Sequence, residues 1–522
     1  MMALGWSVTF LGVCLTAGQV TGDDELAAYH KLRSSFLQKE DMLMNGASLR
    51  LNKVEEEFDR WLTSTVGSLI QQYKKERLQE RFVPATYFPK VRSHIENTTL
   101  YKVLRKMPKG GALHIHFSSA TSLEWIVDKG LLLPGCHVYW PAGSPPSAAS
   151  PKVPKGALAF FNASQAVPDG YLPASQLLQK PGFQAELLKL LTVQPEDEQL
   201  TSAEIWAKFA DVFVRTGHFF TNTAAVQQYL RATLEDFLAD GVSHVEFRID
   251  LFHDQAHLYD LDGREHRGVD KVDVYSRIVS EMQKSAPHLT AKMIASSFRM
   301  RPPEDMEKDL TYAFEVKKQR PDFIVGWDAP GEEDIGRPTL EYAAQLLRVQ
   351  NLSKAYGVDM PLMLHDGESD WSTLNTVDAV LLGAKRIGHG FNILSHPLLM
   401  EEVRKRGVAM EVCPISNQVL RYLTDLRIHP GARMIENGLP VTLSSDDPGI
   451  WGARGLSHDF WEATVAWQLN TRTLKALARN SLEYSGLTGA EKEGALRNWE
   501  KDWDHFMATW KSLVSDEHQV YV

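Results

Sequence analysis

Two histidines in the segment Ala112-Leu-His-Ile-His116 have the spacing of a metal-binding pair. Side chains alternate between the two faces of a β-strand, so His114 and His116 point to the same side if this segment is extended. Neighbouring neutral imidazoles are common ligands of Zn²⁺. Two polar residues of a half-buried strand would have the same spacing, so the pair indicates a metal site only when further ligand-type residues join it.

Further ligand-type residues occur where three other predicted strands end. His365, His389 and the pair Asp446-Asp447 each lie at the carboxyl end of a short segment with strand composition. In parallel barrel enzymes the carboxyl ends of the strands converge on one active site. Three histidines and one aspartate meeting there would bind a metal ion and leave one coordination position to water. Four separate strand ends that all carry ligand-type residues are hard to explain by a structural role.

A metal ion lowers the pKa of a bound water from about 15.7 to about 7, which would make this a hydrolytic site. His389 is then placed to orient the water and to transfer its proton. Glu368, which follows His365 closely in the sequence, is a candidate general acid, because a dry pocket would raise its pKa and keep it protonated. Asp447 could accept a hydrogen bond from the substrate or from hydroxide. The alternative for Glu368 and Asp447 is a structural role around the site.

Eight segments with strand composition must position these residues. Most of them are separated by amphipathic helical segments, at residues 272–285, 303–319, 339–356, 373–384 and 397–406. This alternation predicts an α/β fold, a (β/α)₈ TIM-type barrel of about 250 residues with insertions. A doubly wound open sheet is the alternative, but no glycine-rich phosphate loop follows the first strand. The predicted strands are residues 112–116, 244–250, 289–298, 323–328, 361–365, 386–389, 409–413 and 441–446.

The remaining segments predict the domain organisation. Residues 23–100 form an N-terminal helical region, with an apolar stripe at helical spacing from Leu51 to Tyr73 that could pack on the same chain or on a second copy. Residues 101–515 form the barrel domain. Its insertion after strand one, at about residues 130–200, begins with a Pro-, Gly- and Ser-rich loop at 134–156. Two further helices are expected at residues 201–220 and 224–238.

The first 22 residues contain no Lys, Arg, Asp or Glu and include an apolar run from Ala3 to Ala17. They predict a secretory signal peptide and hence an extracellular, secreted protein; a buried N-terminal helix is the alternative. Three sequons, at Asn97, Asn162 and Asn351, predict N-glycosylation and agree with secretion. No later segment approaches the roughly 20 apolar residues of a membrane span.

The composition argues against a nucleic-acid-binding protein and against a fold stabilised by disulfides. The 522-residue chain has a formal net charge of −10 and no Lys/Arg-rich stretch, which argues against nucleic-acid binding. Cys14 lies in the expected signal peptide, so only Cys136 and Cys413 remain for the mature chain. Two free thiols are expected, with one bridge between them as the alternative, so a disulfide framework does not stabilise the fold.

Five motifs of this chain resemble the adenosine/AMP deaminase superfamily, and most closely its secreted branch, the adenosine-deaminase-related growth factors. The resemblance covers nearly the whole mature chain, including the N-terminal helices and the insertion. It implies one Zn²⁺ per chain and the hydrolytic removal of ammonia from C6 of adenosine, and also of 2′-deoxyadenosine, in purine metabolism. It also suggests a homodimer. The motifs lie at residues 107–116, 365–371, 386–391, 411–418 and 444–448.

The same resemblance implies roles for individual residues. Glu368 would donate a proton and His389 would activate the water. Asp447 and Gly331 would contact the substrate. The zinc ligands would be His114, His116, His365 and Asp446.

Several positions depart from the family pattern and leave the substrate open. Phe117 stands where the family has an aspartate after the second histidine, and Phe298 stands where the branch has a substrate-binding histidine. The ribose-side helix would contribute Trp206 and Phe213, but it has Ala210 where an acidic residue is expected. A disulfide of the insertion is also missing. Lost hydrogen bonds to a buried ribose would weaken binding by about 1–3 kcal/mol each.

Three other functions compete with an extracellular adenosine deaminase. One is a related hydrolase that acts on a modified or 2′-altered purine nucleoside. Another is a growth-factor-like signalling protein that keeps a zinc site and binds a cell-surface receptor or glycan; a general acid such as Glu368 would have no use there. A binuclear amidohydrolase is disfavoured, because its bridging carboxylated lysine would lie at the end of strand four, where the chain has Trp327-Asp328.

Overall fold

A computed structural model describes residues 22–75, 82–141, 153–162, 164–251 and 257–515. The expected signal peptide, apart from its last residue Gly22, therefore lies outside the described residues. Among the described residues, no helix has the length and apolar character needed to cross a membrane.

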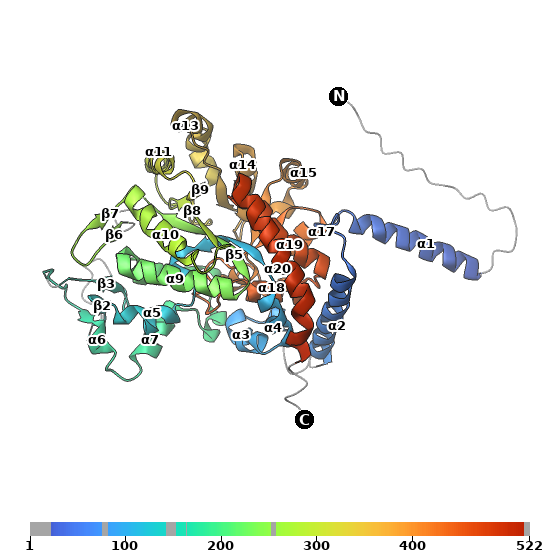
Figure 1. The fold of residues 1–522 in the computed structure, drawn as a ribbon, viewed down its shortest axis with the longest axis horizontal. Helices are drawn as coiled ribbons and strands as arrows, with labels where there is room; N and C mark the ends of the chain where they lie inside the picture. The colour runs from blue at the N-terminus through green and yellow to red at the C-terminus, as the bar shows by residue number, and fades with distance from the viewer. Residues whose placement is uncertain (1–21, 76–81, 142–152, 163, 252–256, 516–522) are drawn as a thin grey trace.

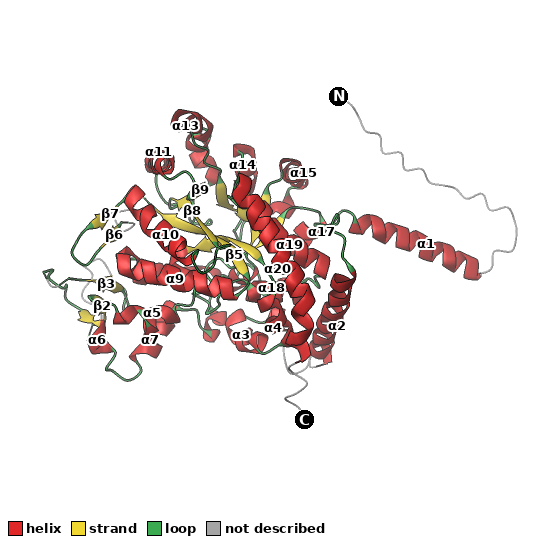
Figure 2. Cartoon of the chain, in the orientation of Figure 1, coloured by secondary structure: helices red, strands yellow, loops and turns green. Residues whose placement is uncertain are grey.

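Parallel strands form a closed barrel at the centre of the molecule, with helices outside it (Figure 2). They make two four-stranded sheets, in the orders β1-β5-β8-β9 and β10-β11-β12-β13. Two isolated parallel bridges join the sheets, one from Trp327 to Leu362 and one from Ile115 to Asp446. The strands are β1 (Gly110–His116), β5 (Val242–Asp250), β8 (Thr290–Ser296), β9 (Ile324–Asp328), β10 (Met363–Asp366), β11 (Arg386–His389), β12 (Ala409–Val412) and β13 (Val441–Leu443).

The predicted (β/α)₈ barrel is confirmed, and each barrel strand overlaps a predicted one. Three of them end earlier than expected, β8 at Ser296, β12 at Val412 and β13 at Leu443. Phe298 and Asp446 therefore lie in the loops that follow β8 and β13. Such loops form the carboxyl-terminal face of a barrel, where side chains are free to line a cavity.

Helices cover the outside of the barrel. Their apolar faces pack on the strands in one continuous core, which includes Leu234 of α9, Leu310 of α11 and Leu477 of α19. The helices between and after the later strands are α10 (Gly268–Met282), α11 (Pro303–Gln319), α14 (Asn375–Leu382), α15 (Pro397–Arg406), α16 (Pro414–Val419), α17 (Pro430–Glu436), α18 (Ser457–Ala466), α19 (Thr471–Glu483) and α20 (Gly489–Ser515).

The helix expected at residues 339–356 is divided into a 3₁₀ turn and two short helices. The 3₁₀ turn η7 spans Thr339–Tyr342, and α12 (Ala343–Leu346) and α13 (Val349–Tyr356) follow it. The Thr339 hydroxyl donates to Asp366, 2.5 Å away, and the Tyr342 hydroxyl donates to the carbonyl oxygen of Arg301 at 2.7 Å. These tertiary bonds hold the first turn against the core and override the helical pattern of the sequence.

The segment before β1 is largely helical. Helix α1 (Gly22–Asp41) projects from the body of the molecule, and its described side chains are exposed along nearly its whole length (Figure 1). Helix α2 (Lys53–Lys75) instead packs on the same chain, because the Phe58 ring contacts the rings of Phe506 and Trp510 on α20. Two short helices, α3 (Phe88–Glu96) and α4 (Thr99–Lys106), lead into the barrel.

The insertion between β1 and β5 contains a small antiparallel sheet that the sequence did not predict. Strand β2 (Cys136–Tyr139) pairs with β3 (Leu158–Phe160) and β4 (Tyr171–Pro173). Strand β2 lies inside the segment expected to be a loop, because four residues among prolines and glycines are too short to show a strand pattern. The helices of the insertion are α5 (Glu124–Asp128), α6 (Ala174–Leu177), α7 (Phe183–Leu191), α8 (Ser202–Thr216) and α9 (Thr223–Ala239).

The two cysteines of the described chain, Cys136 and Cys413, are both buried and free. This is the outcome expected from the sequence. Burial raises the pKa of the Cys136 thiol to about 12, so the thiol stays protonated at neutral pH.

Candidate active site

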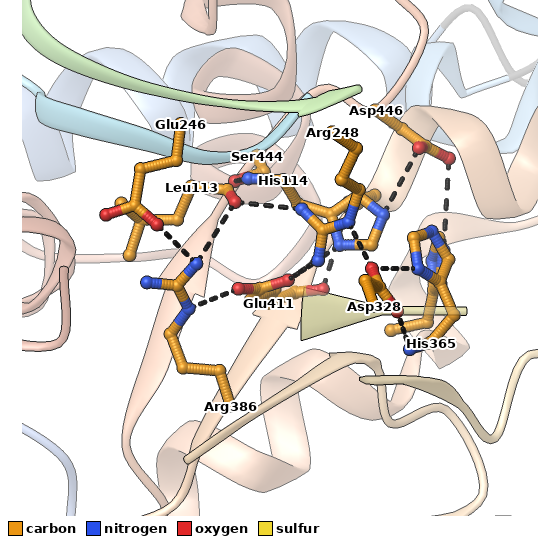
Figure 3. A network of polar contacts seen from close by, with 12 residues as sticks. Leu113, His114, Glu246, Arg248, Asp328, His365, Arg386, Glu411, Ser444 and Asp446 are labelled. Atoms are coloured by element: carbon orange, nitrogen blue, oxygen red, sulfur yellow. Dashed lines mark hydrogen bonds and ion pairs between the residues drawn. The ribbon is translucent and has the colours of Figure 1, made fainter. Parts of the chain in front are cut away.

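The ligand-type side chains predicted from the sequence meet at the carboxyl-terminal end of the barrel. His114 and His116 lie on β1, and His365 lies on β10. The Asp446 Oδ1 atom is 3.3 Å from His114 Nε2 (Figure 3). It is also 3.2 Å from His116 Nε2. His116 Nε2 is also 3.1 Å from His365 Nε2. Three segments far apart in the sequence thus bring their nitrogen and oxygen atoms to one point.

Several of these atoms are buried without a hydrogen-bond partner. Among the described residues around this point, they are His114 Nε2, His389 Nε2 and Asp446 Oδ1. An unpaired buried polar atom destabilises a fold by about 1–3 kcal/mol. Ligand atoms of His114, His365, His389 and Asp446 all lie within 4.8 Å of one another. Imidazole nitrogens around a carboxylate oxygen are the donor set that Zn²⁺ prefers, so the residues fit a metal ion.

The site residues include two with strained backbone. Asp446 has a φ of 60° and His389 has a φ of 62°, in the left-handed region that non-glycine residues seldom occupy. Backbone hydrogen bonds hold Asp446 there: its N–H donates to His114 O at 3.1 Å, and the N–H of His116 donates to Asp446 O at 3.2 Å. The Ser416 hydroxyl donates to Asp446 Oδ2 at 2.7 Å. Strain of this kind is concentrated at functional sites, where the surrounding structure enforces it.

Buried carboxylates orient two of the imidazoles. His114 Nδ1 lies 2.7 Å from Glu411 Oε2, and His365 Nδ1 lies 2.6 Å from Asp328 Oδ2 (Figure 3). A carboxylate only accepts hydrogen bonds, so each ring donates from Nδ1 and turns the lone pair of Nε2 toward the site. Burial lowers the pKa of His365 to about 3, so this ring stays neutral.

Two arginines compensate the charge of these carboxylates. Arg248 donates to both Asp328 and Glu411, and Arg386 donates to Glu411 and, at 2.6 Å, to Glu246 (Figure 3). Burial disfavours a charged Glu411, but the two guanidinium groups outweigh burial and hold its pKa below the ordinary value. All five side chains are buried. This network was not predicted from the sequence, although charged residues inside otherwise apolar strands were a signal for it.

Glu368 and His389 are neighbours beside the cluster of His114, His116, His365 and Asp446, which we call the metal-type cluster. Asn417 Nδ2 donates to Glu368 Oε1 at 2.8 Å, and His389 Nδ1 lies 3.4 Å from the same oxygen. Burial raises the pKa of Glu368 well above its ordinary value, and the nearby Asp446 carboxylate raises it further. Both effects favour the protonated form of the carboxyl group, which is the form that can act as an acid. Burial lowers the pKa of His389 well below its ordinary value.

Two of the residues that follow the second histidine, Phe117 and Ser119, face in different directions. Phe117 is buried in the core, where its ring contacts the rings of Tyr275 and Phe247. Ser119 instead faces the site and donates a short hydrogen bond to Asp447 Oδ1. Asp447 is buried beside Asp446, and burial raises its pKa well above the ordinary value.

A cavity of about 480 Å³ opens above the cluster. This volume lies in the range of small-molecule binding sites. Its floor is polar and includes His116, His365, His389, Glu368 and Asp446. The predicted substrate-binding residues all line it, namely Trp206, Phe213, Phe298, Gly331 and Asp447. Their roles, like those of the predicted ligands and catalytic residues, stay predictions.

The sequons differ in exposure. Asn97 and Asn351 are exposed, whereas Asn162 is half-buried. Glycosylation of these residues stays a prediction.

Comparison with known proteins gives relatives over nearly the full length. The chain matches the family described as adenosine deaminase over residues 188–501 and the family described as adenosine/AMP deaminase N-terminal over residues 9–104. It is 31% identical over 526 residues to adenosine deaminase 2 of Sus scrofa, and this alignment covers 97% of this chain and 98% of the relative. It is 31% identical over 497 residues to adenosine deaminase 2 of Homo sapiens, which covers 91% and 93%.

Solved structures resemble the fold at lower identity. A zinc-bound amidohydrolase from Burkhoderia ambifaria superposes with a TM-score of 0.57 at 18% identity, covering 81% of this chain and 97% of that chain. An adenine deaminase from Arthrobacter aurescens superposes with a TM-score of 0.52 at 19% identity, covering 76% and 98%.

Proposed function

The chain belongs to the adenosine deaminase family, and from that premise we propose that it is a secreted, zinc-dependent deaminase of adenosine and 2′-deoxyadenosine. The family makes it a hydrolase that acts on carbon–nitrogen bonds of cyclic amidines. The proposed reaction adds water at C6 of the purine and releases ammonia, giving inosine from adenosine. The observation that carries this proposal is the convergence of unpaired His114 Nε2 and Asp446 Oδ1 below a cavity that Glu368 lines.

We propose that His114, His116, His365 and Asp446 hold one Zn²⁺. When bound, the ion lowers the pKa of a water molecule to about 7 and so supplies a nucleophile at neutral pH. Glu411 and Asp328 keep the Nε2 lone pairs of His114 and His365 directed at the site through the hydrogen bonds at 2.7 and 2.6 Å. His389 Nε2 also faces the cluster, 3.9 Å from Asp446 Oδ2.

The environments of His389 and Glu368 suit one to accept a proton and the other to donate one. His389 is neutral because burial lowers its pKa, so its unpaired Nε2 can accept a proton from the attacking water. Burial favours the protonated form of Glu368, which can donate to the ring nitrogen next to C6, where negative charge develops during the attack. The proton held by His389 then joins the amino group, which leaves as ammonia. The proton of the new C6 hydroxyl returns to Glu368 as the C6 carbonyl of inosine forms. Asp447 and the backbone of Gly331 line the cavity and would hydrogen-bond the base.

A direct test uses the purified, zinc-loaded chain with adenosine. We expect loss of adenosine absorbance with stoichiometric release of ammonia. The Glu368→Gln variant keeps the size of the side chain and its contact with Asn417 but has no acidic proton, so its turnover should fall by about 10²–10⁴-fold with zinc retained. Unchanged turnover in this variant would remove Glu368 from the mechanism. Failure of the wild-type chain to deaminate any 6-aminopurine nucleoside would refute the proposed function.

Secretion is supported by the sequence of the first 22 residues and by the exposure of Asn97 and Asn351. Expression in animal cells should place a glycosylated chain in the medium, with an N-terminus near residue 22. Retention of an unprocessed chain inside the cells would contradict an extracellular role.

A further inference from the structure

The cavity above the metal-type cluster has two zones of opposite polarity. Its titratable floor residues lie at the barrel end, around Glu368 and Asp446. Its outer wall is formed by α8 and by the loops after β8 and β9. This wall presents Phe209, Ala210, Phe213, Val214, Phe298 and Met300. Among the described residues of the outer wall, Glu332 alone carries a charge.

The apolar wall continues outward to the mouth of the cavity. Phe298 is 49% exposed, Met300 is 41% exposed and Val214 is 55% exposed. Apolar side chains gathered around an opening are unfavourable in water and typically mark the place where an apolar part of a ligand binds. The mouth is therefore suited to a group without hydroxyls.

This polarity constrains a nucleoside bound for deamination. When C6 of the base lies at the floor near Glu368, the sugar on N9 lies at the opposite side of the purine, toward the wall and the mouth. We place its 5′ group against the apolar wall. A sugar hydroxyl that loses water there without a partner weakens binding by about 1–3 kcal/mol. An apolar group at the same position would instead bury its surface against Phe213 and Phe298.

We propose that the preferred substrates are 6-aminopurine nucleosides whose 5′ hydroxyl is replaced by an apolar thioether, the class of 5′-deoxy-5′-alkylthioadenosines. A thioether sulfur gains favourable contacts with aromatic rings such as those of Phe213 and Phe298. This inference rests on the proposed function. The reaction is unchanged: water oxygen bonds to C6, the carbon–nitrogen bond breaks, ammonia leaves, and the thioether does not react.

The test compares kcat/KM for three compounds on the zinc-loaded chain: adenosine, 5′-deoxyadenosine and 5′-deoxy-5′-(methylthio)adenosine. We expect the methylthio compound to exceed adenosine about tenfold, with 5′-deoxyadenosine between them. A ratio of methylthio compound to adenosine below about three, with adenosine deaminated, overturns this inference and leaves the proposed function intact. Absence of turnover with all three compounds overturns the proposed function itself.

A matched pair of variants on α8 tests the wall directly. Ala210 lines the cavity, whereas Ala207 is exposed on the same helix and lies outside the lining. Glutamine is nearly as good a helix former as alanine, so both variants should fold. Ala210→Gln adds a hydrogen-bonding group to the wall and should lower the ratio of methylthio compound to adenosine about tenfold, while Ala207→Gln should leave it unchanged. The same ratio in both variants would contradict an apolar wall that selects the substrate.

Discussion

Arg248 lies at the centre of the charges beneath the cavity floor, between Glu411 and Asp328. These two carboxylates orient His114 and His365, so the arginine acts on the site without touching the cavity. Charges buried this deeply are tolerated only when each is paired and hydrogen-bonded. The geometry of the predicted ligands therefore depends on a residue from a different strand.

Replacement of Arg248 by methionine should lower the free energy of unfolding by about 3–5 kcal/mol, because two buried carboxylates lose their partner. Urea denaturation of the metal-free protein measures this difference. The control is Arg497→Met, since Arg497 is 63% exposed and should change stability by less than about 0.5 kcal/mol. Equal stabilities for the two variants would contradict a structural role for the network.

The sequence was sufficient for residues whose chemistry is unusual in a strand. Two histidines at alternate positions and ligand-type residues at strand ends were enough to predict that His114, His116, His365, His389 and Asp446 lie together. It was not sufficient for the partners that orient them. Glu411, Asp328 and Arg248 come from three strands with no fixed spacing, so their pairing depends on the closure of the barrel.

At the scale of elements, the loop after β9 shapes the cavity wall through Gly331. Its φ is 135°, and a Cβ there would lie 2.9 Å from the Phe298 ring. Conformations of this kind are essentially restricted to glycine. The loop and the wall residue Phe298 therefore hold each other in place.

Gly331→Ala should destabilise the protein by about 1–3 kcal/mol and lower kcat/KM, because both the backbone and Phe298 must shift. Gly67→Ala is the matched control: Gly67 lies in the interior of α2 with no atom within 4 Å of a Cβ. That substitution should stabilise by about 0.5–1 kcal/mol. Thermal unfolding of both variants measures the two effects, and shifts of the same sign would contradict this account of the loop.

Elements with strong periodicity were predictable, and short ones were not. The barrel strands and helices α10, α11 and α15 follow the apolar pattern of the sequence closely. The sheet of β2, β3 and β4 was missed because each strand has only three or four residues. The division of residues 339–356 was missed because hydrogen bonds to Asp366 and to the Arg301 backbone, distant in sequence, determine it.

At the scale of the whole molecule, α1 stands apart from the barrel (Figure 1). Leu26, Tyr29, Leu32 and Phe36 are each more than half exposed, and their spacing places them along one side of the helix. An apolar stripe on a projecting helix is unfavourable in water unless something covers it. We propose that a second copy of the chain covers it, so that the protein is a homodimer.

Deletion of residues 23–41 should convert this dimer to a monomer, with the barrel still folded. Light scattering after size-exclusion chromatography gives the mass of each form, and circular dichroism checks the fold. A full-length chain with the mass of a monomer would refute the dimer, as would a shortened chain that keeps the mass of a dimer.

The proposed binding of a single metal ion by His114, His116, His365 and Asp446 can be tested by anomalous diffraction at the zinc absorption edge, with crystals of the zinc-loaded chain. One peak per chain is expected, within bonding distance of His114 Nε2 and Asp446 Oδ1. Two adjacent peaks, or a single peak away from these atoms, would contradict it.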